Sequence, residues 1–175
     1  MAVPIEIDVW QGEVAELEVD AIIIPANESL FMTTPVARAV KRRAGDSVEA
    51  DAVQQGPAAA GSVVVTGGGS LAVPYVIHAI GVGHDLRADG DRLEQALGAA
   101  FDAAGRLGLR RLAIVPVGTE RGVFEPEEAA AHLVAVLERR AAAGEPLPTS
   151  MVVTTTSAAE LAALRILLLP IGSTG

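Results

Sequence analysis

The sequence predicts a three-layer α/β/α sandwich with a mixed, mostly parallel central sheet. Short apolar segments of strand length alternate with longer segments in which apolar residues recur at helical spacing. Residues 21–24 and 112–115 are apolar throughout, as expected of strands that are covered on both faces. At 175 residues and without a break in composition, the chain is expected to form a single domain over residues 1–175.

The first half of the chain predicts an edge strand, a central strand and a helix. Residues 5–10 alternate apolar and polar side chains, which indicates a strand with one solvated face at the edge of a sheet. Residues 21–24 predict a central strand that ends at Pro25-Ala26-Asn27. Thr34 and Pro35 are typical of an N-cap and a first helical turn, so we expect a helix from Pro35 to about Gly45.

The second half predicts a hairpin followed by further helices and strands. Two short apolar strands, at 63–65 and 75–77, flank a glycine cluster at 67–69 that is typical of a turn rather than of a phosphate-binding loop. The remaining expected elements are a helix over 91–107, a strand over 112–115, a helix from Pro126, a strand over 151–153 and a last helix opened by a Ser157/Glu160 capping box.

Composition and charge exclude several functional classes. Half of the residues are hydrophobic and 20% are charged, which excludes a disordered chain. The net charge of −9 repels polyanions, so we expect no nucleic-acid partner and a phosphate ligand only where it is bound locally. Without cysteine there are no disulfides, thiolate zinc sites or thiol nucleophiles, and three scattered histidines indicate no metal site. We therefore expect no cofactor.

The N-terminal residues and the lengths of the apolar segments predict the cellular location of the protein. The first residues lack the basic start and apolar run of a secretion signal, and no apolar stretch reaches the roughly 18–20 residues of a membrane helix. We expect a cytoplasmic protein without a membrane partner. Ligands of such sheets bind at the carboxyl ends of the strands, which directs attention to the loops at 25–35 and 116–125.

Several motifs resemble those of macro domains, and they follow the family's order over about the whole chain. Gly12-Glu13-Val14 and residues 19–30 (VDAIIIPANESL) are similar to the family's G-D-I and V-D-A-I-V-N-A-A-N-S-x-L. Residues 36–45, 61–66 and 75–78 resemble its V-x-x-A-I-x-x-A-A-G, G-x-A-x-x-T and Y-V-I-H motifs. Residues 122–130 are similar to its G-I-Y/F-G-x-P-x-E-E-A-A segment.

The resemblance implies a ligand class and a set of contacts. Macro domains bind ADP-ribose, and some hydrolyse O-acetyl-ADP-ribose or ADP-ribose esters, so the implied partner is ADP-ribose or an ADP-ribosylated substrate. By resemblance, Glu13 beside Val14 would accept the adenine amino group and Asn27 would bond the distal ribose. The phosphates and distal ribose would be lined by Thr119, Gly122, Val123 and Phe124. A helix N-terminus and backbone N–H groups can hold a diphosphate in an acidic chain.

The first phosphate loop departs from the family pattern. Met32-Thr33-Thr34-Pro35 replaces a run of glycines, which restricts the backbone and removes one N–H donor. The hydroxyls of Thr33 and Thr34 are candidate replacement donors, and Phe31 and Met32 are candidates to fill the groove. The acid that lies ten positions after the loop asparagine in deacetylase-type members is Ala37 here.

The second phosphate loop also departs from the pattern. Thr119-Glu120-Arg121-Gly122 lies where the family has S-T-G or G-T-G. Glu120 would repel a diphosphate, whereas Arg121 would pair with it unless it is simply solvated.

Three functions follow as alternatives: an ADP-ribose-binding module, a hydrolase of ADP-ribosyl esters, and a diverged fold whose cleft is plugged by Phe31 and Met32. Structural readings also stay open at single residues. The structural alternative for Asn27 is bonding to backbone groups at a strand end, and that for Phe124 is packing in the core. His78, inside an apolar strand, is expected to be a core residue.

Overall fold

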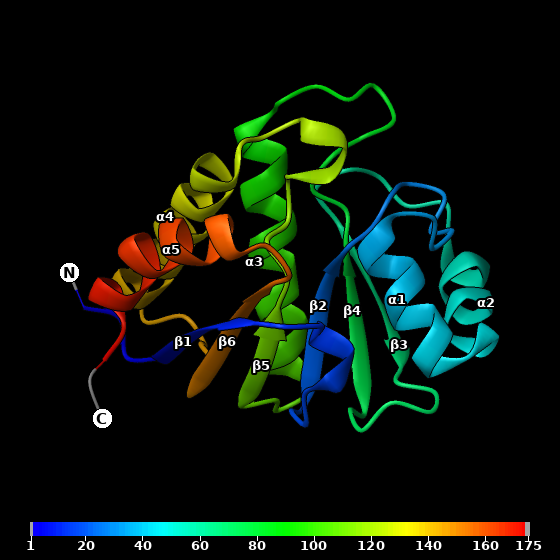
Figure 1. The fold of residues 1–175 in the computed structure, drawn as a ribbon, viewed down its shortest axis with the longest axis horizontal. Coiled ribbons are helices and arrows are strands. Elements are labelled where there is room, and N and C mark those ends of the chain that lie inside the picture. Colours follow the sequence, from blue (N-terminus) through cyan, green and yellow to red (C-terminus); the bar gives the residue numbers. More distant parts are fainter. Residues whose placement is uncertain (1, 174–175) are drawn as a thin grey trace.

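The computed structural model describes residues 2–173 and has three layers, a six-stranded sheet between two layers of helices (Figure 1). The sheet order is β1-β6-β5-β2-β4-β3. In chain order the strands are β1 (Glu6–Gln11), β2 (Ala21–Pro25), β3 (Val63–Gly67), β4 (Tyr75–Ala79), β5 (Arg111–Ile114) and β6 (Ser150–Thr155). All neighbouring pairs are parallel except β3 and β4, so the predicted mixed, mostly parallel sheet is confirmed.

The helices pack on both faces of this sheet. They are α1 (Pro35–Ala44), α2 (Asp46–Gln55), α3 (Gly90–Arg106), α4 (Pro126–Ala143) and α5 (Ala158–Leu168), with short 3₁₀ turns η1 (Val14–Glu16), η2 (Glu120–Gly122) and η3 (Leu169–Ile171). Apolar side chains of α3, α4 and α5 form one core with the sheet, and those of η1 and α1 form a second core on the other face. The helices of each layer bury their apolar faces against the strands, which is the arrangement that alternating strands and helices predict.

The central strand shows why periodicity predicted this sheet. All five residues of β2 are buried, because Ile22 and Ile24 face the α1 core while Ala21 and Ile23 face the α3 core. β2 pairs in parallel with β4 on one side and with β5 on the other. The edge position predicted for residues 5–10 is confirmed, since β1 pairs only with β6 among the described strands.

The glycine cluster forms the predicted hairpin turn. β3 and β4 pair antiparallel from Val63 opposite Ala79 to Gly67 opposite Tyr75. Gly69 has φ 58°, a left-handed conformation that favours glycine, and a Cβ there would lie 2.3 Å from the Ala44 carbonyl oxygen. The cluster therefore serves the turn and its packing on α1.

Two features differ from the sequence analysis. The sequence pattern gave no sign of α2, because this ten-residue helix buries only Val48 and Ala52 and so shows little apolar periodicity. The predicted capping box of α5 is half wrong. Ser157 Oγ accepts the Glu160 N–H (3.3 Å), but the Glu160 carboxylate accepts the hydroxyl of Thr155 (2.6 Å) instead of the Ser157 N–H.

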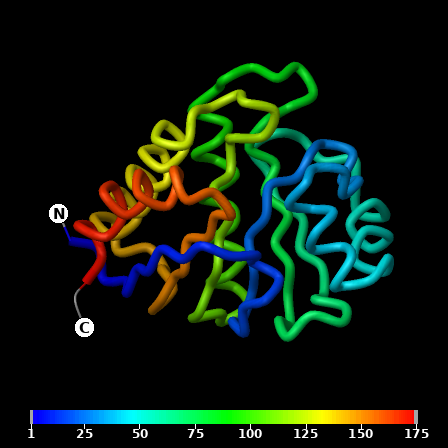
Figure 2. The backbone as a smooth tube through the Cα atoms, viewed as in Figure 1, coloured from blue at the N-terminus to red at the C-terminus, as the bar shows by residue number. Residues whose placement is uncertain are grey.

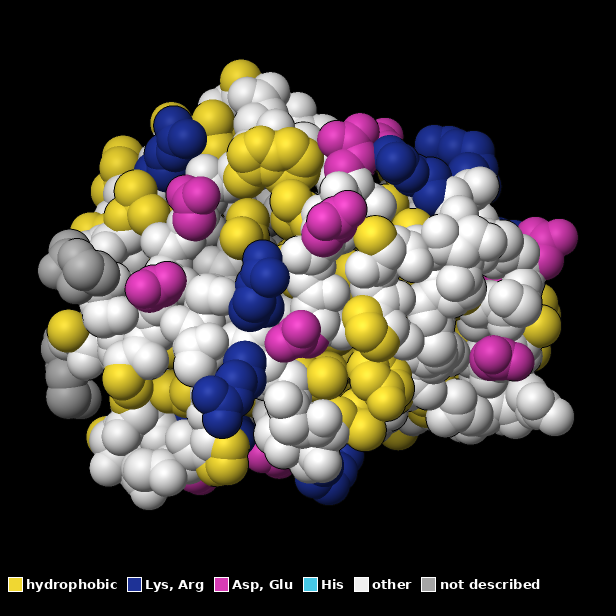
Figure 3. All heavy atoms as spheres, turned by 90° about the horizontal axis from the view of Figure 1, so that it is seen from below, with side chains coloured by type: hydrophobic (Ala, Val, Ile, Leu, Met, Phe, Trp, Pro, Cys, Tyr) yellow, Lys and Arg dark blue, Asp and Glu magenta, His cyan; other side chains and the backbone are white. Residues whose placement is uncertain are grey.

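Three loops meet at the carboxyl ends of the parallel strands. Figure 2 shows the segments that follow β2, β4 and β5 together at one end of the molecule. The face at the opposite end, seen in Figure 3, has acidic and basic side chains interspersed with apolar ones, and neither sign gathers there. Within residues 2–173, none of the helices is both long and apolar enough to cross a membrane.

Candidate functional site

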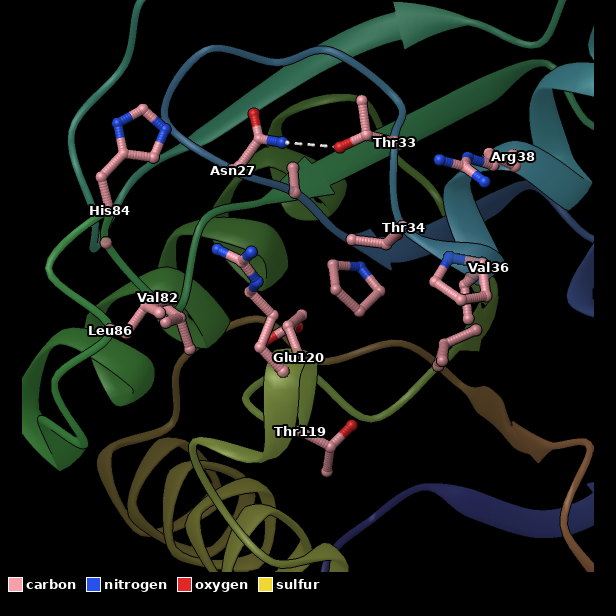
Figure 4. Close-up of a pocket in the computed structure, with 16 residues that line it drawn as sticks. Asn27, Thr33, Thr34, Val36, Arg38, Val82, His84, Leu86, Thr119 and Glu120 are labelled. Carbon is pink, nitrogen blue, oxygen red and sulfur yellow. Dashed lines mark hydrogen bonds between the residues drawn. The ribbon is translucent and has the colours of Figure 1, made fainter.

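A groove of about 840 Å³, here called the larger hollow, lies where the three loops meet the N-terminus of α1 (Figure 4). Its walls come from the segment after β2, the first turn of α1, the loop before α3, and η2. The lining residues are Pro25, Ala26, Asn27, Thr33, Thr34, Pro35, Val36, Arg38, Val82, Gly83, His84, Leu86, Val115, Thr119, Glu120 and Arg121. This volume is typical of sites for small molecules and cofactors.

A second cavity of about 390 Å³, the smaller hollow, adjoins the first. The two share Pro35, Val36, Val115 and Thr119 as lining residues. The smaller hollow is also lined by Glu13, Val14 and the segment 154–157, which runs from the end of β6 to the residue before α5. The structure thus places Glu13 and Asn27, which are 14 positions apart in sequence, in adjoining hollows on either side of the α1 N-terminus.

Asn27 both shapes its loop and faces the larger hollow. Its Nδ2 donates to the carbonyl oxygen of Phe31 (3.0 Å), and its Oδ1 accepts the hydroxyl of Ser29 (2.7 Å). Nδ2 also lies 3.5 Å from the hydroxyl oxygen of Thr33, the contact drawn in Figure 4. The side chain therefore has the backbone-bonding role that was one alternative, while it still lines the groove.

The loop that replaces the glycine run leaves the groove open. Met32 is buried in the core beneath α1, and its N–H donates to the Glu49 carboxylate (2.7 Å). Phe31 is 52% exposed, and neither side chain lines the larger hollow. The expectation that Phe31 and Met32 fill the groove is wrong, because Met32 is buried in the core and Phe31 is exposed outside the lining of the larger hollow. Ala37 is also buried in this core, so α1 presents no carboxylate at that position.

Thr34 has a structural task as well as a place in the groove. Its hydroxyl oxygen accepts the Ala37 N–H (3.2 Å), which makes it the N-cap of α1 as the sequence predicted. Pro35 follows in the first turn. The positive end of the α1 dipole is thereby directed at the wall that the two hollows share.

Glu120 places a carboxyl group in the second loop. Both of its carboxylate oxygens lie 3.0 Å from the Gly118 nitrogen, whose N–H they accept. Burial raises the pKa of Glu120 from 4.5 to about 6, although the Gly118 N–H bond acts in the other direction. Arg121, next in the chain, has a left-handed backbone (φ 55°), which is unusual for a residue other than glycine.

The remaining predicted residues of this loop lie outside both hollows. Phe124 is 6% exposed and packs in the core, with its ring edge-on to His132 at 5.4 Å between centroids. Phe124 thus occupies the core position given as its alternative. Gly122 and Val123 are not among the lining residues either. The predicted contacts of these three residues with a ligand stay predictions.

The larger hollow also contains residues that the sequence analysis missed. Arg38 lies one turn into α1, and His84 and Leu86 come from the loop before α3. Glu28 holds that loop, since its carboxylate accepts the His84 N–H (3.0 Å) and lies 3.3 Å from His84 Nδ1. The His84 N–H bond lowers the pKa of Glu28. No motif marked these residues, because the loop that contains His84 joins the groove only through the fold.

His78 lies outside the site. Its ring is 1% exposed, and its Nε2 lies 3.0 Å from the hydroxyl oxygen of Thr66. Burial lowers the pKa of His78 to about 4, so the ring is neutral at neutral pH. The prediction that His78 is a core residue is confirmed.

The fold and the groove define a class: an α/β/α domain with a ligand-sized cleft at the carboxyl ends of its central strands. The Macro domain family model matches residues 23–133, which is more than half of the chain. The chain therefore belongs to the macro domain family, as its motifs indicated.

Relatives and solved structures agree with this assignment. The chain is 34% identical over 135 residues to a Mycobacterium tuberculosis protein, a match that covers 77% of this chain but only 38% of that protein. It is 32% identical over 130 residues to an Aquifex aeolicus protein, covering 74% of this chain and 79% of the relative.

Two solved structures share the fold at low sequence identity. A Trypanosoma brucei macrodomain in complex with ADP-ribose superposes with a TM-score of 0.82 at 21% identity, covering 92% of this chain and 68% of that one. A mutant Oceanobacillus iheyensis macrodomain with ADPR superposes with a TM-score of 0.80 at 20% identity, covering 91% and 90%.

Proposed function

We propose that this chain is an ADP-ribose-binding module. The observation that carries the proposal is the pair of adjoining hollows, with Glu13 in one and Asn27 in the other, on either side of the α1 N-terminus. ADP-ribose has the matching order of groups: adenosine at one end, a diphosphate in the middle and a ribose at the other end. Macrodomains of the same fold have been solved with ADP-ribose.

Each part of the ligand has a candidate partner. The Glu13 carboxylate would accept the adenine amino group in the smaller hollow beside Val14, and Asn27 would bond the hydroxyls of the distal ribose. The diphosphate would lie against the N-terminus of α1, near Thr33, Thr34 and Thr119, where the helix dipole favours negative charge.

Calorimetric titration tests the proposal directly. The purified chain is titrated with ADP-ribose, with AMP and ADP as partial ligands, and saturable binding that prefers ADP-ribose is expected. Glu13→Ala and Asn27→Ala should each weaken binding by about tenfold or more, because each removes hydrogen bonds worth about 1–3 kcal/mol to a bound ligand. Glu127→Ala, an exposed acid on α4, is the charge-matched control. No heat at millimolar ADP-ribose would refute the proposal.

Hydrolysis of ADP-ribosyl esters is the second candidate, and one observation favours it. His84 lines the larger hollow with the Glu28 carboxylate 3.3 Å from its Nδ1, so an imidazole that can act as a general base is oriented beside a carboxylate. O-acetyl-ADP-ribose is incubated with the chain and with the His84→Gln and Asn27→Ala variants. Turnover that falls in both variants would assign the activity. Binding without turnover would support the binding module and count against hydrolysis of this ester.

A further inference from the structure

Most backbone N–H groups of the first loop already have partners inside the protein. The Met32 N–H donates to the Glu49 carboxylate, and the Thr33 N–H donates to the Phe31 carbonyl oxygen (3.0 Å). Pro35 has no N–H. The Ala37 N–H is taken by the N-cap of α1. A diphosphate at this loop would therefore find few of the backbone donors that a glycine run can supply.

The second loop is engaged in the same way. The Gly118 N–H is bonded to the Glu120 carboxylate. The N–H groups of Gly122, Val123 and Phe124 donate to the carbonyl oxygens of Thr119, Glu120 and Gly118 at 3.0, 3.2 and 3.0 Å. These bonds close the η2 turn on itself, so they are not available to a ligand unless the turn opens. Few backbone donors of either loop are therefore left for an anion in this groove.

Two guanidinium groups lie in the same hollow and supply what the loops lack. Arg38 comes from α1 and Arg121 from η2, which form different walls of the larger hollow; Figure 4 shows Arg38 on the α1 side and Glu120 on the other. Both arginines are exposed, and within residues 2–173 neither forms a salt bridge. Nearby cations differ, since Lys41 pairs with Glu49 (2.7 Å) and Arg92 with Asp85 (3.0 Å).

We propose that Arg38 and Arg121 bind the diphosphate of the ligand from two walls of the groove, in addition to the few backbone amides of the two loops that have no partner within the protein. Guanidinium groups present paired N–H donors that match phosphate oxygens, and they hold their charge at any physiological pH. In a chain of net charge −9, two arginines without salt bridges in the lining of one groove place positive charge where a diphosphate would lie. This inference rests on the proposed function and names the residues that would give the site its affinity for a diphosphate.

The expected signature is a charge-dependent loss confined to ligands with phosphate. Arg38→Ala and Arg121→Ala should each weaken ADP-ribose binding by about tenfold, in line with a charge-assisted hydrogen-bond pair. Arg38→Lys should keep part of the affinity, because lysine retains the charge without the paired donors. The salt dependence of the dissociation constant should also become shallower in each alanine variant, because one charge contact is lost.

Calorimetry at two sodium chloride concentrations makes the test, with Arg106→Ala as the matched control. Arg106 is exposed in the last turn of α3, lines neither hollow, and carries the same charge. Adenosine, which lacks phosphate, serves as the ligand whose binding should not change. Thermal melting of each variant shows that it is folded.

The outcomes separate the contact of Arg38 and Arg121 with the diphosphate, here called the clamp, from the proposed function. If the unmodified chain does not bind ADP-ribose, both fail together. If it binds, and the Arg38 and Arg121 variants behave as the Arg106 control does, the clamp is overturned while the binding module stands. A loss in only one of the two variants also overturns the two-walled clamp. A loss in both, with unchanged adenosine binding and a shallower salt dependence, supports it.

Discussion

We predict that Glu120 makes the binding of ADP-ribose depend on pH. Its carboxyl group lines the larger hollow, and burial raises its pKa to about 6. When Glu120 is ionised it repels a diphosphate, and when it is protonated this repulsion is gone. We therefore expect ADP-ribose to bind more tightly as the pH falls through about 6, with uptake of one proton, and we expect Glu120→Gln to remove that dependence.

The size of the effect follows from the pKa. With a pKa of about 6, roughly 3% of Glu120 is protonated at pH 7.5 and roughly 76% at pH 5.5. If the ligand binds only the protonated form, its apparent affinity rises in proportion to that fraction, by about 25-fold over this range. The Gln variant should bind about equally at both pH values, at the affinity of the protonated form.

The assay is calorimetric titration with ADP-ribose at pH 5.5 and 7.5, in pairs of buffers with different ionisation enthalpies so that proton uptake is measured directly. The imidazole of His84 also lines the larger hollow, and the Glu28 carboxylate lies 3.3 Å from its Nδ1. Both chains are therefore compared in a His84→Gln background.

Three results would refute the reasoning. An affinity that is the same at both pH values would show that the Glu120 carboxylate does not meet the ligand's charge. A pH dependence that persists unchanged in Glu120→Gln would assign the proton to another group. A variant that binds more weakly than the parent at pH 7.5 would show that Glu120 supports the loop more than it repels the ligand, through the Gly118 N–H bond.

Three further predictions concern stability and are measured by urea denaturation. Burial lowers the pKa of His78 from 6.5 to about 4, so its contribution to the free energy of unfolding is fully present above pH 6.5, and about 3 kcal/mol should be lost as the pH falls to 4. The His78→Gln variant is compared in a Glu120→Gln background, because the raised pKa of Glu120 has the opposite effect on stability. The same dependence of the free energy of unfolding on pH with and without His78 would contradict the prediction. Arg140→Ala should cost about 1–2 kcal/mol, because this 5%-exposed side chain loses its bonds to Asp102 (2.8 Å) and Glu145 (2.9 Å) while the two half-exposed carboxylates stay hydrated; no measurable cost would count against it. Thr34→Ala should cost about 1 kcal/mol by removing the α1 cap, whereas Thr34→Ser should keep stability.

Local patterns accounted for most of the fold because they report burial. The continuous apolar run of β2 predicted a strand covered on both faces, and the alternation before Gln11 predicted the edge strand β1. Thr34 and Pro35 predicted the start of α1 to the residue. Periodicity failed for α2, which buries only two side chains and is held by its contact with β3 and by the turn at Gly45 rather than by an apolar stripe.

The groove shows the division between sequence and tertiary structure. Motif order along the chain was enough to give the family, the sheet and the two loops that hold Asn27, Thr34 and Thr119, since these depend on local spacing. Which side chains of these loops face the groove depends on the tertiary structure. Met32 and Phe124 do not line it, because both are buried in the hydrophobic cores.

Arg38 and His84, which carry no local signal, were brought to the groove from different elements by the packing of α1 and of the loop before α3. The bond between Glu120 and Gly118 is likewise a product of packing. A pattern can record which residues are apolar and where turns fall, but which polar groups remain free for a ligand depends on partners that the fold supplies.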